Sequence, residues 1–283
     1  KDRWIVSNIL EMTSNSKSGY LFSDNEKITF NKYRVDAITD YALDFVDDFS
    51  DEPFFLTVSY LEPHHQNSTD THEAPDGRED LFKNFEVPPD LLPGEGNWEK
   101  EYAKYLACCN SIDENVKRLL DKLEEKGIRQ NTVIIYSSDH GSHFKTRPGT
   151  YKRSCHESSI RVPLIINGGP FNTGKKISGL ATILDIPVTI MKLAGLTPPG
   201  RVYGLDLSEY VNDENAMMRD DVFIQISEIE VGRAIRTDRY KMHVTSCDGS
   251  GPFDPHATAY RYVCLYDLKE DPGEHNNLID NPK

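Results

Sequence analysis

The chain has 283 residues with 37% hydrophobic content, and its 46 Asp and Glu against 32 Lys and Arg give a formal net charge of −14 at pH 7. This length and apolar content are sufficient for a substantial core, so the sequence is that of a globular protein. The acidic balance argues against general binding to nucleic acid or to a membrane surface, and no apolar run approaches the roughly 20 residues that span a bilayer.

The first half of the chain alternates polar stretches with predicted elements. The first 35 residues are polar and rich in Asn and Ser, which indicates loop with little regular structure. Apolar residues then recur at helical spacing from Asp36 to Val46, and Phe54–Tyr60 is a β-prone apolar run. Residues 66–97 lack periodicity and are predicted as a long surface excursion, which in compact domains is often functional.

A second series of elements follows. Apolar residues spaced by threes and fours predict a helix over 99–126, with Gly127 at its end. Thr132–Tyr136 and Leu164–Ile166 are predicted as strands, and 183–193 as a helix. Such alternation is typical of an α/β fold with a mainly parallel sheet sandwiched by helices.

The sequence changes in character after about residue 210. Four short strand-like runs at close spacing predict a small antiparallel C-terminal subdomain; they begin at Val222, Arg233, Tyr240 and Arg261. We therefore expect an α/β domain over residues 1–210 and the subdomain over residues 211–283.

Residues 137–163 concentrate candidate functional side chains. Asp139 and His140 come directly after the predicted strand 132–136, and ligands of open α/β sheets collect at such strand ends. The segment that follows is basic within an acidic chain, because a single acid, Glu157, accompanies two histidines and five cations: His143, His156, Lys145, Arg147, Lys152, Arg153 and Arg161. The contrast predicts a local site for an anionic group.

The five cysteines are too few and too irregular for a disulfide scaffold. No C-x-x-C pair indicates zinc, and a Cys247–Cys264 bridge is left open.

Several motifs taken together resemble the formylglycine-dependent sulfatases of the alkaline-phosphatase superfamily. They occur in family order from about residue 36 to the end of the chain: Pro53 to His65, Ser138-Asp139-His140-Gly141, Lys152, Glu157 to Ile165, Leu193 to Leu196 and Leu265 to Leu278. The resemblance implies an alkaline-phosphatase-like fold with the small antiparallel α+β subdomain at its C-terminal end.

The sequence also departs from the family. Sulfatases carry near their N-terminus a paired-Asp metal site and a Cys/Ser-x-Pro-x-Arg motif whose first residue becomes formylglycine. Thr197–Arg201 has that spacing, but we reject it because it is a Pro/Gly-rich loop headed by Thr. We therefore expect the chain to be the C-terminal two-thirds of a sulfatase, without the nucleophile and inactive alone.

The resemblance assigns roles residue by residue. Asp139 and His140 would be metal ligands for Ca²⁺, with the remaining ligands and the formylglycine in the absent part. Lys152 would contact the sulfate, and His64 would donate to the sulfate or protonate the leaving alcohol. His65, His143, Arg153 and His156 are candidate substrate-binding residues, with solvated or buried structural roles as the alternative; Glu157 and Arg161 are expected to form an ion pair.

The predicted function is sulfuric ester hydrolysis on a sulfated carbohydrate, by attack of a hydrated formylglycine on sulfur. The expected partner is a sulfated sugar, with no nucleic acid and no membrane insertion, and the expected location is the periplasm or the cell exterior. Two alternatives stay open: a related metal-dependent phosphoesterase or phosphonate hydrolase, and a non-catalytic anion-binding fragment.

Overall fold

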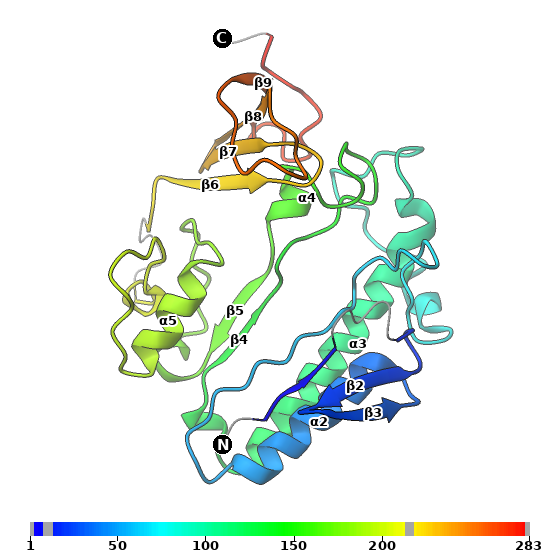
Figure 1. Cartoon of the computed structure of the whole chain (residues 1–283), viewed down its shortest axis with the longest axis vertical. Helices are drawn as coiled ribbons and strands as arrows, with labels where there is room; N and C mark the ends of the chain where they lie inside the picture. Colours follow the sequence, from blue (N-terminus) through cyan, green and yellow to red (C-terminus); the bar gives the residue numbers. More distant parts are fainter. Residues whose placement is uncertain (1–2, 8–13, 213–217, 281–283) are drawn as a thin grey trace. The chain divides into compact units, whose positions relative to one another are not determined.

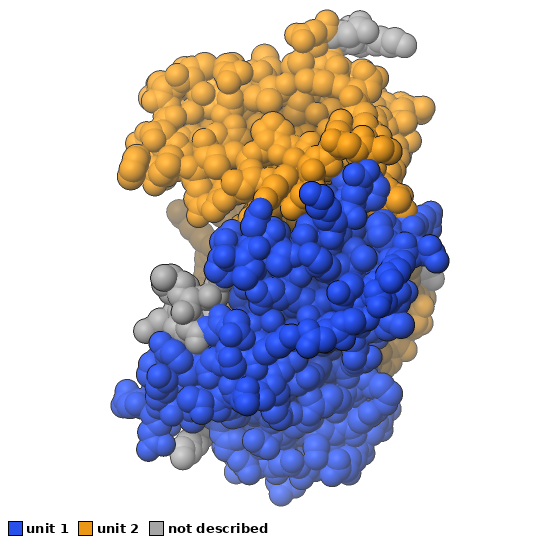
Figure 2. Space-filling model, turned by 90° about the vertical axis from the view of Figure 1, so that its right-hand side faces the viewer, with its two compact units in different colours: residues 1–86, 98–132 blue, residues 87–97, 133–283 orange. Residues whose placement is uncertain are grey.

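The computed structural model describes residues 3–7, 14–212 and 218–280 (Figure 1). The chain separates into two compact units, drawn in different colours in Figure 2. Unit 1 contains residues 1–86 and 98–132, and unit 2 contains residues 87–97 and 133–283. The boundary expected at residue 210 was drawn from a change in sequence pattern and not from compactness, so it stays a prediction.

Unit 1 begins with a three-stranded antiparallel sheet in the order β1-β2-β3, formed by β1 (Ile5–Val6), β2 (Gly19–Ser23) and β3 (Glu26–Phe30). The prediction of little regular structure over the first 35 residues was wrong. Leu21 on β2 and Phe30 on β3 are buried, and Asp24 turns the hairpin with a left-handed φ of 54°. These strands are short and carry many polar residues, so the alternation of apolar and polar residues is hard to recognise in the sequence.

The helices of unit 1 lie close to where the sequence predicts them. They are α2 (Arg34–Phe49) and α3 (Trp98–Glu125), with short 3₁₀ turns η1 (Arg78–Phe82) and η2 (Arg129–Asn131). Val35 of α2 and Ile112 of α3 share one buried cluster, and Asn115 Nδ2 donates to Asp36 Oδ1 at 2.8 Å. The predicted excursion over 66–97 is confirmed as loop, apart from η1 and one isolated bridge.

Phe54–Tyr60 is not assigned as a strand, although its burial alternates as a strand's does. Phe54, Leu56 and Val58 are partly buried, whereas Phe55 is 70% exposed. Periodicity thus identified its two faces, but a strand also requires a hydrogen-bonded neighbour, and local sequence does not supply one.

Unit 2 holds a two-stranded and a four-stranded sheet. Strand β4 (Ile134–Ser137) pairs with β5 (Leu164–Asn167), and the second sheet has the order β6-β7-β8-β9. The latter strands are β6 (Asp221–Ile226), β7 (Gly232–Thr237), β8 (Tyr240–Ser246) and β9 (Tyr260–Asp267). The remaining elements are α4 (Glu157–Ile160), η3 (Gly169–Phe171), α5 (Asp185–Leu193) and η4 (Leu207–Glu209).

The α/β class and the small antiparallel C-terminal sheet are confirmed. The expected parallel pairing is not seen, because every strand pair assigned in the described residues is antiparallel. Between β4 and β5 the chain forms a long loop with only the four-residue α4, whereas parallel neighbours require a packed crossover. Within the described residues, no helix is long and apolar enough to cross a membrane.

A buried charge network joins the β4–β5 loop to the C-terminal sheet of unit 2. Lys241 on β8 has a fully buried side chain whose Nζ lies 3.2 Å from Glu157 Oε1 and also contacts Glu274 Oε1. Glu157 also pairs with Arg236 of β7 at 3.4 Å, and its backbone N–H donates to Glu274 at 2.6 Å. Glu157 therefore pairs with Lys241 and Arg236 of the sheet. Among the described residues, the ion pair with Arg161 that the sequence suggested is not formed.

Candidate active site

Asp139 and His140 lie directly after β4, where the sequence places them. The Asp139 carboxylate accepts the His140 backbone N–H at 2.9 Å, and its side chain is 83% exposed. Its other oxygen lies 3.5 Å from His140 Nε2. A carboxylate oxygen and an imidazole nitrogen therefore face a common point at the strand end.

The tautomer of His140 follows from its neighbours. Nδ1 lies 2.9 Å from the Gly141 carbonyl oxygen, which can only accept, so Nδ1 carries the proton. Nε2 then presents a lone pair, and the Lys152 ammonium lies 3.0 Å from it. The structure thus brings together Asp139, His140 and Lys152, two electron-pair donors and one cation.

This donor pair fits part of a divalent cation site. Calcium binds oxygen ligands at roughly 2.3–2.6 Å and takes about 6–8 of them, so two donor atoms 3.5 Å apart can share one ion. His140 is a less usual ligand for calcium than Asp139, but its lone pair is already directed at a positive group, Lys152. Asp139 and His140 would supply two positions of the shell.

Gly141 lets this turn approach α4 closely. Its N–H donates to the Ser159 carbonyl at 2.7 Å, and a Cβ at this position would lie 2.1 Å from the Ser158 carbonyl oxygen. Any side chain at position 141 would therefore displace the turn that carries Asp139 and His140.

Arg153 lies in the same loop with its side chain 31% exposed. It forms an ion pair with Glu228 and donates to Thr150 Oγ1 at 3.1 Å. A substrate anion would have to compete with Glu228, so a substrate role for Arg153 stays a prediction.

His143 and His156 of unit 2 are buried. His143 is fully buried, burial lowers its pKa to about 4, and neither ring nitrogen has a hydrogen-bond partner among the described residues. Burial also lowers the pKa of His156 to about 3, and its Nε2 lies 3.4 Å from the Tyr266 hydroxyl. Both rings are neutral at pH 7 and are placed to support the loop, and a substrate contact by either stays a prediction.

The histidines of unit 1 form a second group. His64 is partly buried, its N–H donates to the Leu61 carbonyl at 2.9 Å, and its own carbonyl accepts from Gln66. His65 is 4% exposed, and its Nε2 lies 3.4 Å from Asp70. His65 is therefore an interior ring, whereas His64 is the more accessible of the pair.

His72 was missed by sequence reasoning. Its ring lies 5.3 Å from that of His65, and its Nδ1 lies 3.1 Å from Glu101 Oε2 on α3. Burial alone would raise the pKa of Glu101, but hydrogen bonds from His72, Thr71 and Lys104 lower it to about 2. The partners are 29 residues apart, so no local motif signals them.

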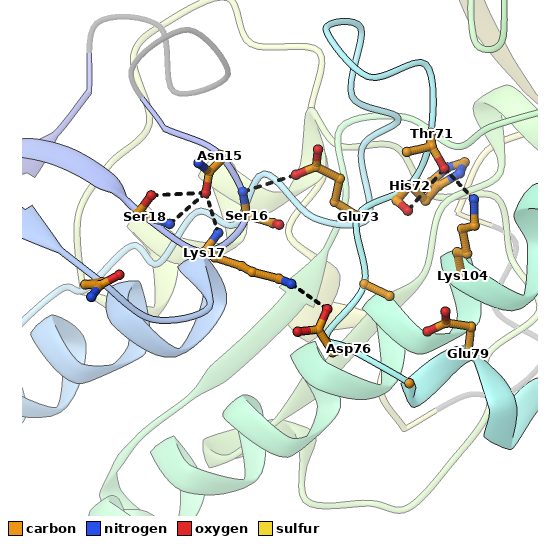
Figure 3. Close-up of a pocket in the computed structure, with 13 residues that line it drawn as sticks. Asn15, Ser16, Lys17, Ser18, Thr71, His72, Glu73, Asp76, Glu79 and Lys104 are labelled. Carbon is orange, nitrogen blue, oxygen red and sulfur yellow. Dashed lines mark hydrogen bonds and ion pairs between the residues drawn. The ribbon is translucent and has the colours of Figure 1, made fainter.

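Beside this group, unit 1 has a polar cavity of about 540 Å³ (Figure 3). Residues 15–18 line one side, where the Ser16 N–H donates to Glu73 and Lys17 pairs with Asp76. Thr71, His72 and Lys104 line the other side, and Lys104 Nζ donates to Thr71 Oγ1 at 2.7 Å. This lining of hydroxyls, amides and charges suits a polar ligand.

Comparison with known protein families gives two matches. The family described as Sulfatase matches residues 6–196, more than half of the chain, and the family described as N-sulphoglucosamine sulphohydrolase, C-terminal, matches residues 149–283.

Two curated relatives have similar names. An ulvan-active sulfatase of Formosa agariphila is 27% identical over 95% of this chain and 52% of its own length. An arylsulfatase of Clostridium perfringens is 27% identical over 81% of this chain and 50% of its own length. The chain thus spans about half the length of these relatives.

Solved structures show the same fold. The structure of BT4656, in complex with its substrate D-glucosamine-2-N,6-O-disulfate, has a TM-score of 0.74 at 20% identity and covers 99% of this chain and 72% of that one. The phosphonate monoester hydrolase of Agrobacterium radiobacter has a TM-score of 0.53 at 22% identity and covers 64% of this chain and 37% of that one. The fold is therefore alkaline-phosphatase-like, and with the match over residues 6–196 the chain belongs to the sulfatase family.

Proposed function

We propose that the protein is a sulfuric ester hydrolase that removes sulfate from a sulfated carbohydrate. The observation that carries the proposal is the convergence of Asp139, His140 and Lys152 at the end of β4. Sulfatases generally use a formylglycine and a divalent metal, and this convergence offers metal donors beside a cation.

Sulfate ester cleavage demands stabilisation of negative charge on the sulfuryl oxygens. The Lys152 ammonium is a compact point charge suited to such an oxygen, and it lies 3.0 Å from His140 Nε2. A metal ion bound at Nε2 would take that lone pair and leave the ammonium to contact the sulfate. A divalent ion such as Ca²⁺, held by Asp139 and His140, would act as a Lewis acid on the same oxygens. Neither contribution requires proton transfer.

His64 is proposed to donate a hydrogen bond to the sulfate or a proton to the leaving alcohol, because imidazole titrates near neutral pH. Its neighbour His65 is buried and contacts Asp70, and we propose that it supports the loop that carries His64. We propose that three residues support the loop that carries Lys152: Arg153, His143 and His156. Arg153 is the candidate among them for direct contact with the substrate.

The substrate class is proposed from the relatives. One is an ulvan-active sulfatase, and a structural neighbour was solved with D-glucosamine-2-N,6-O-disulfate. A sulfated sugar unit is the substrate common to both descriptions, and export to the periplasm or the cell exterior would bring the protein to such polymers.

The test is turnover of an aryl sulfate and of sulfated sugars by the full-length protein that contains this chain. Asp139→Asn and Lys152→Met should each lower kcat/KM by about 10²–10³-fold, as expected for loss of one charge-stabilising group. Lys269→Met, which removes an exposed cation paired with Asp238 in the same unit, is the matched control and should leave turnover unchanged. Wild-type activity in either site variant would refute the assignment.

A phosphoesterase or phosphonate hydrolase is the second candidate, favoured by the fold shared with the phosphonate monoester hydrolase. Sulfate and phosphate esters share tetrahedral geometry, so the same donors suit both. Dominant turnover of aryl phosphate or phosphonate over aryl sulfate would establish this candidate. Tight binding of a sulfated sugar without turnover in the full-length protein would instead establish a non-catalytic role.

A further inference from the structure

Three metal-ligand side chains meet in the interior of unit 2, in a group of residues that no proposed catalytic step uses. The candidate ligand atoms of Cys155, His243 and Cys264 all lie within 4.8 Å of one another. The residues are 1%, 6% and 4% exposed, respectively. Two thiols and an imidazole in an interior position are the donor set that thiophilic metal ions select.

The fold explains why these distant residues meet. His243 on β8 and Cys264 on β9 are directly opposite in the antiparallel register, so their side chains project from the same face of the sheet. Cys155 comes just before α4, and α4 is attached to β8 through Glu157 and Lys241. The third ligand is thus carried to the sheet by the buried charge network.

The surroundings resemble those of a metal centre. The Glu230 carboxylate lies 3.1 Å from His243 Nε2, which leaves Nδ1 as the nitrogen for a ligand. A carboxylate on the second ring nitrogen is what orients metal-binding histidines. Cys155 and Cys264 also belong to an apolar cluster with Ile226, Ala234 and Leu268, which would exclude water.

We propose that Cys155, His243 and Cys264 form a binding site for a thiophilic divalent cation, with Zn²⁺ as the ion that fits, and with Glu230 as the residue that orients His243. Zinc binds thiolate at about 2.3 Å and imidazole at about 2.0–2.1 Å, so tetrahedral ligand atoms are roughly 3.4–3.8 Å apart. The observed limit of 4.8 Å requires the ligands to close by at most about 1.0–1.4 Å around the ion.

The contacts within the site shift the pKa values of two of its members. Burial alone would lower the pKa of His243, but hydrogen bonds to Cys264 and Glu230 raise it to about 9. A hydrogen bond from Cys155 and the His243 contact lower the pKa of Cys264.

Zn²⁺ binds thiolates and neutral imidazole, so its binding would release to solvent the protons that these ligands carry. The complex then contains two thiolates, one neutral imidazole and the Glu230 carboxylate. Affinity should accordingly fall as the pH is lowered, because protons compete with the ion for the ligands.

The experiment uses the reduced whole chain and Co²⁺ as a spectroscopic probe for the zinc position. One equivalent of Co²⁺ should produce thiolate-to-cobalt charge-transfer absorption with release of protons, read with a pH indicator. Zn²⁺ should then abolish the absorption by displacing Co²⁺, without further proton release. Cys155→Ser and Cys264→Ser should each lose stoichiometric binding. Glu230→Gln should retain the absorption with affinity lowered about 10–100-fold, and it keeps the test decisive if a cysteine variant fails to fold.

Two controls isolate the site. Cys247→Ser removes an exposed thiol of the β8–β9 loop and should bind as the wild type does. Asp139→Asn should also leave the thiolate absorption intact, which separates this site from the proposed sulfatase centre. The proposal is overturned if folded, reduced wild-type chain shows no thiolate–cobalt absorption, if Cys264→Ser retains it, or if a Cys155–Cys264 disulfide forms in protein kept under reductant.

Discussion

Replacing Lys241 with Met tests how strongly the buried charge network holds unit 2 together. In the folded protein the Lys241 side chain is 0% exposed, and its ammonium contacts Glu157 and Glu274, whose side chains are 16% and 2% exposed. The variant keeps most of the volume but removes the cation that the two buried carboxyl groups share, which leaves Glu157 only its pairing with Arg236. Burial would then oppose their ionisation.

The magnitude follows from the geometry. Removing one partner of a buried ion pair costs about 3–5 kcal/mol, because the remaining charge loses its compensation. With a shift of about 2–4 °C per kcal/mol for a chain of this size class, the melting temperature should fall by roughly 6–20 °C. The loss of about 3–5 kcal/mol is a large fraction of the unfolding free energy of a typical domain, about 5–15 kcal/mol.

Urea unfolding at several pH values provides the assay, with the exposed Lys269→Met variant as control. Burial alone would raise the pKa of Glu157, but Lys241 and Arg236 lower it below 4.5, so its contribution is present above pH 4.5 and is lost as the pH falls through the folded pKa. Without Lys241 the buried carboxyls can instead become neutral by protonation at acidic pH. The stability difference between wild type and Lys241→Met should therefore shrink as the pH is lowered from 7. A difference under 1 kcal/mol, or one independent of pH, would refute the reasoning.

Two further predictions concern the sites themselves. Glu101→Gln should lower stability by about 1–3 kcal/mol at pH 7, because it removes a charged hydrogen-bond acceptor from His72 and Lys104. The folded pKa of about 2 lies below the ordinary 4.5, so the wild-type advantage should vanish in urea unfolding as the pH falls from 4.5 to 2, and an undiminished advantage at pH 2 would contradict this origin. Gly141→Ala should weaken Ca²⁺ binding measured by calorimetry, since its Cβ would lie 2.1 Å from the Ser158 carbonyl oxygen. Gly200→Ala, where a Cβ meets nothing within 4 Å, is the matched control, and equal affinities in the two variants would show that the turn tolerates the displacement.

Local periodicity predicted the elements that it dominates. Helix α3 lies within one residue of the expected range, because its apolar stripe runs for seven turns without interruption. The four C-terminal strands were each predicted, since β-branched and aromatic residues mark them between short turns. The β2–β3 hairpin was missed because its five-residue strands lie in a stretch rich in Ser and Asn, although Ile28 and Phe30 alternate with Lys27 and Thr29 as in a half-buried strand.

The candidate site was predictable only where its members are close in the sequence. Asp139 and His140 are adjacent and follow a strand, which any α/β fold places at the sheet end. The His72–Glu101 and His243–Cys264 contacts join residues from different elements, and their proximity depends on strand register and helix packing. Local sequence does not encode either of these.

The interleaved connectivity of the two units limits how the protein can be divided. The backbone passes from one unit to the other after residues 86, 97 and 132. A fragment starting at residue 133 would therefore lack the short stretch whose Asn97 N–H bonds the Phe144 carbonyl and whose Pro89 carbonyl accepts from His275. No single protease cut can therefore release either unit intact. Expression of one continuous segment would lose contacts beside the loop that carries Lys152.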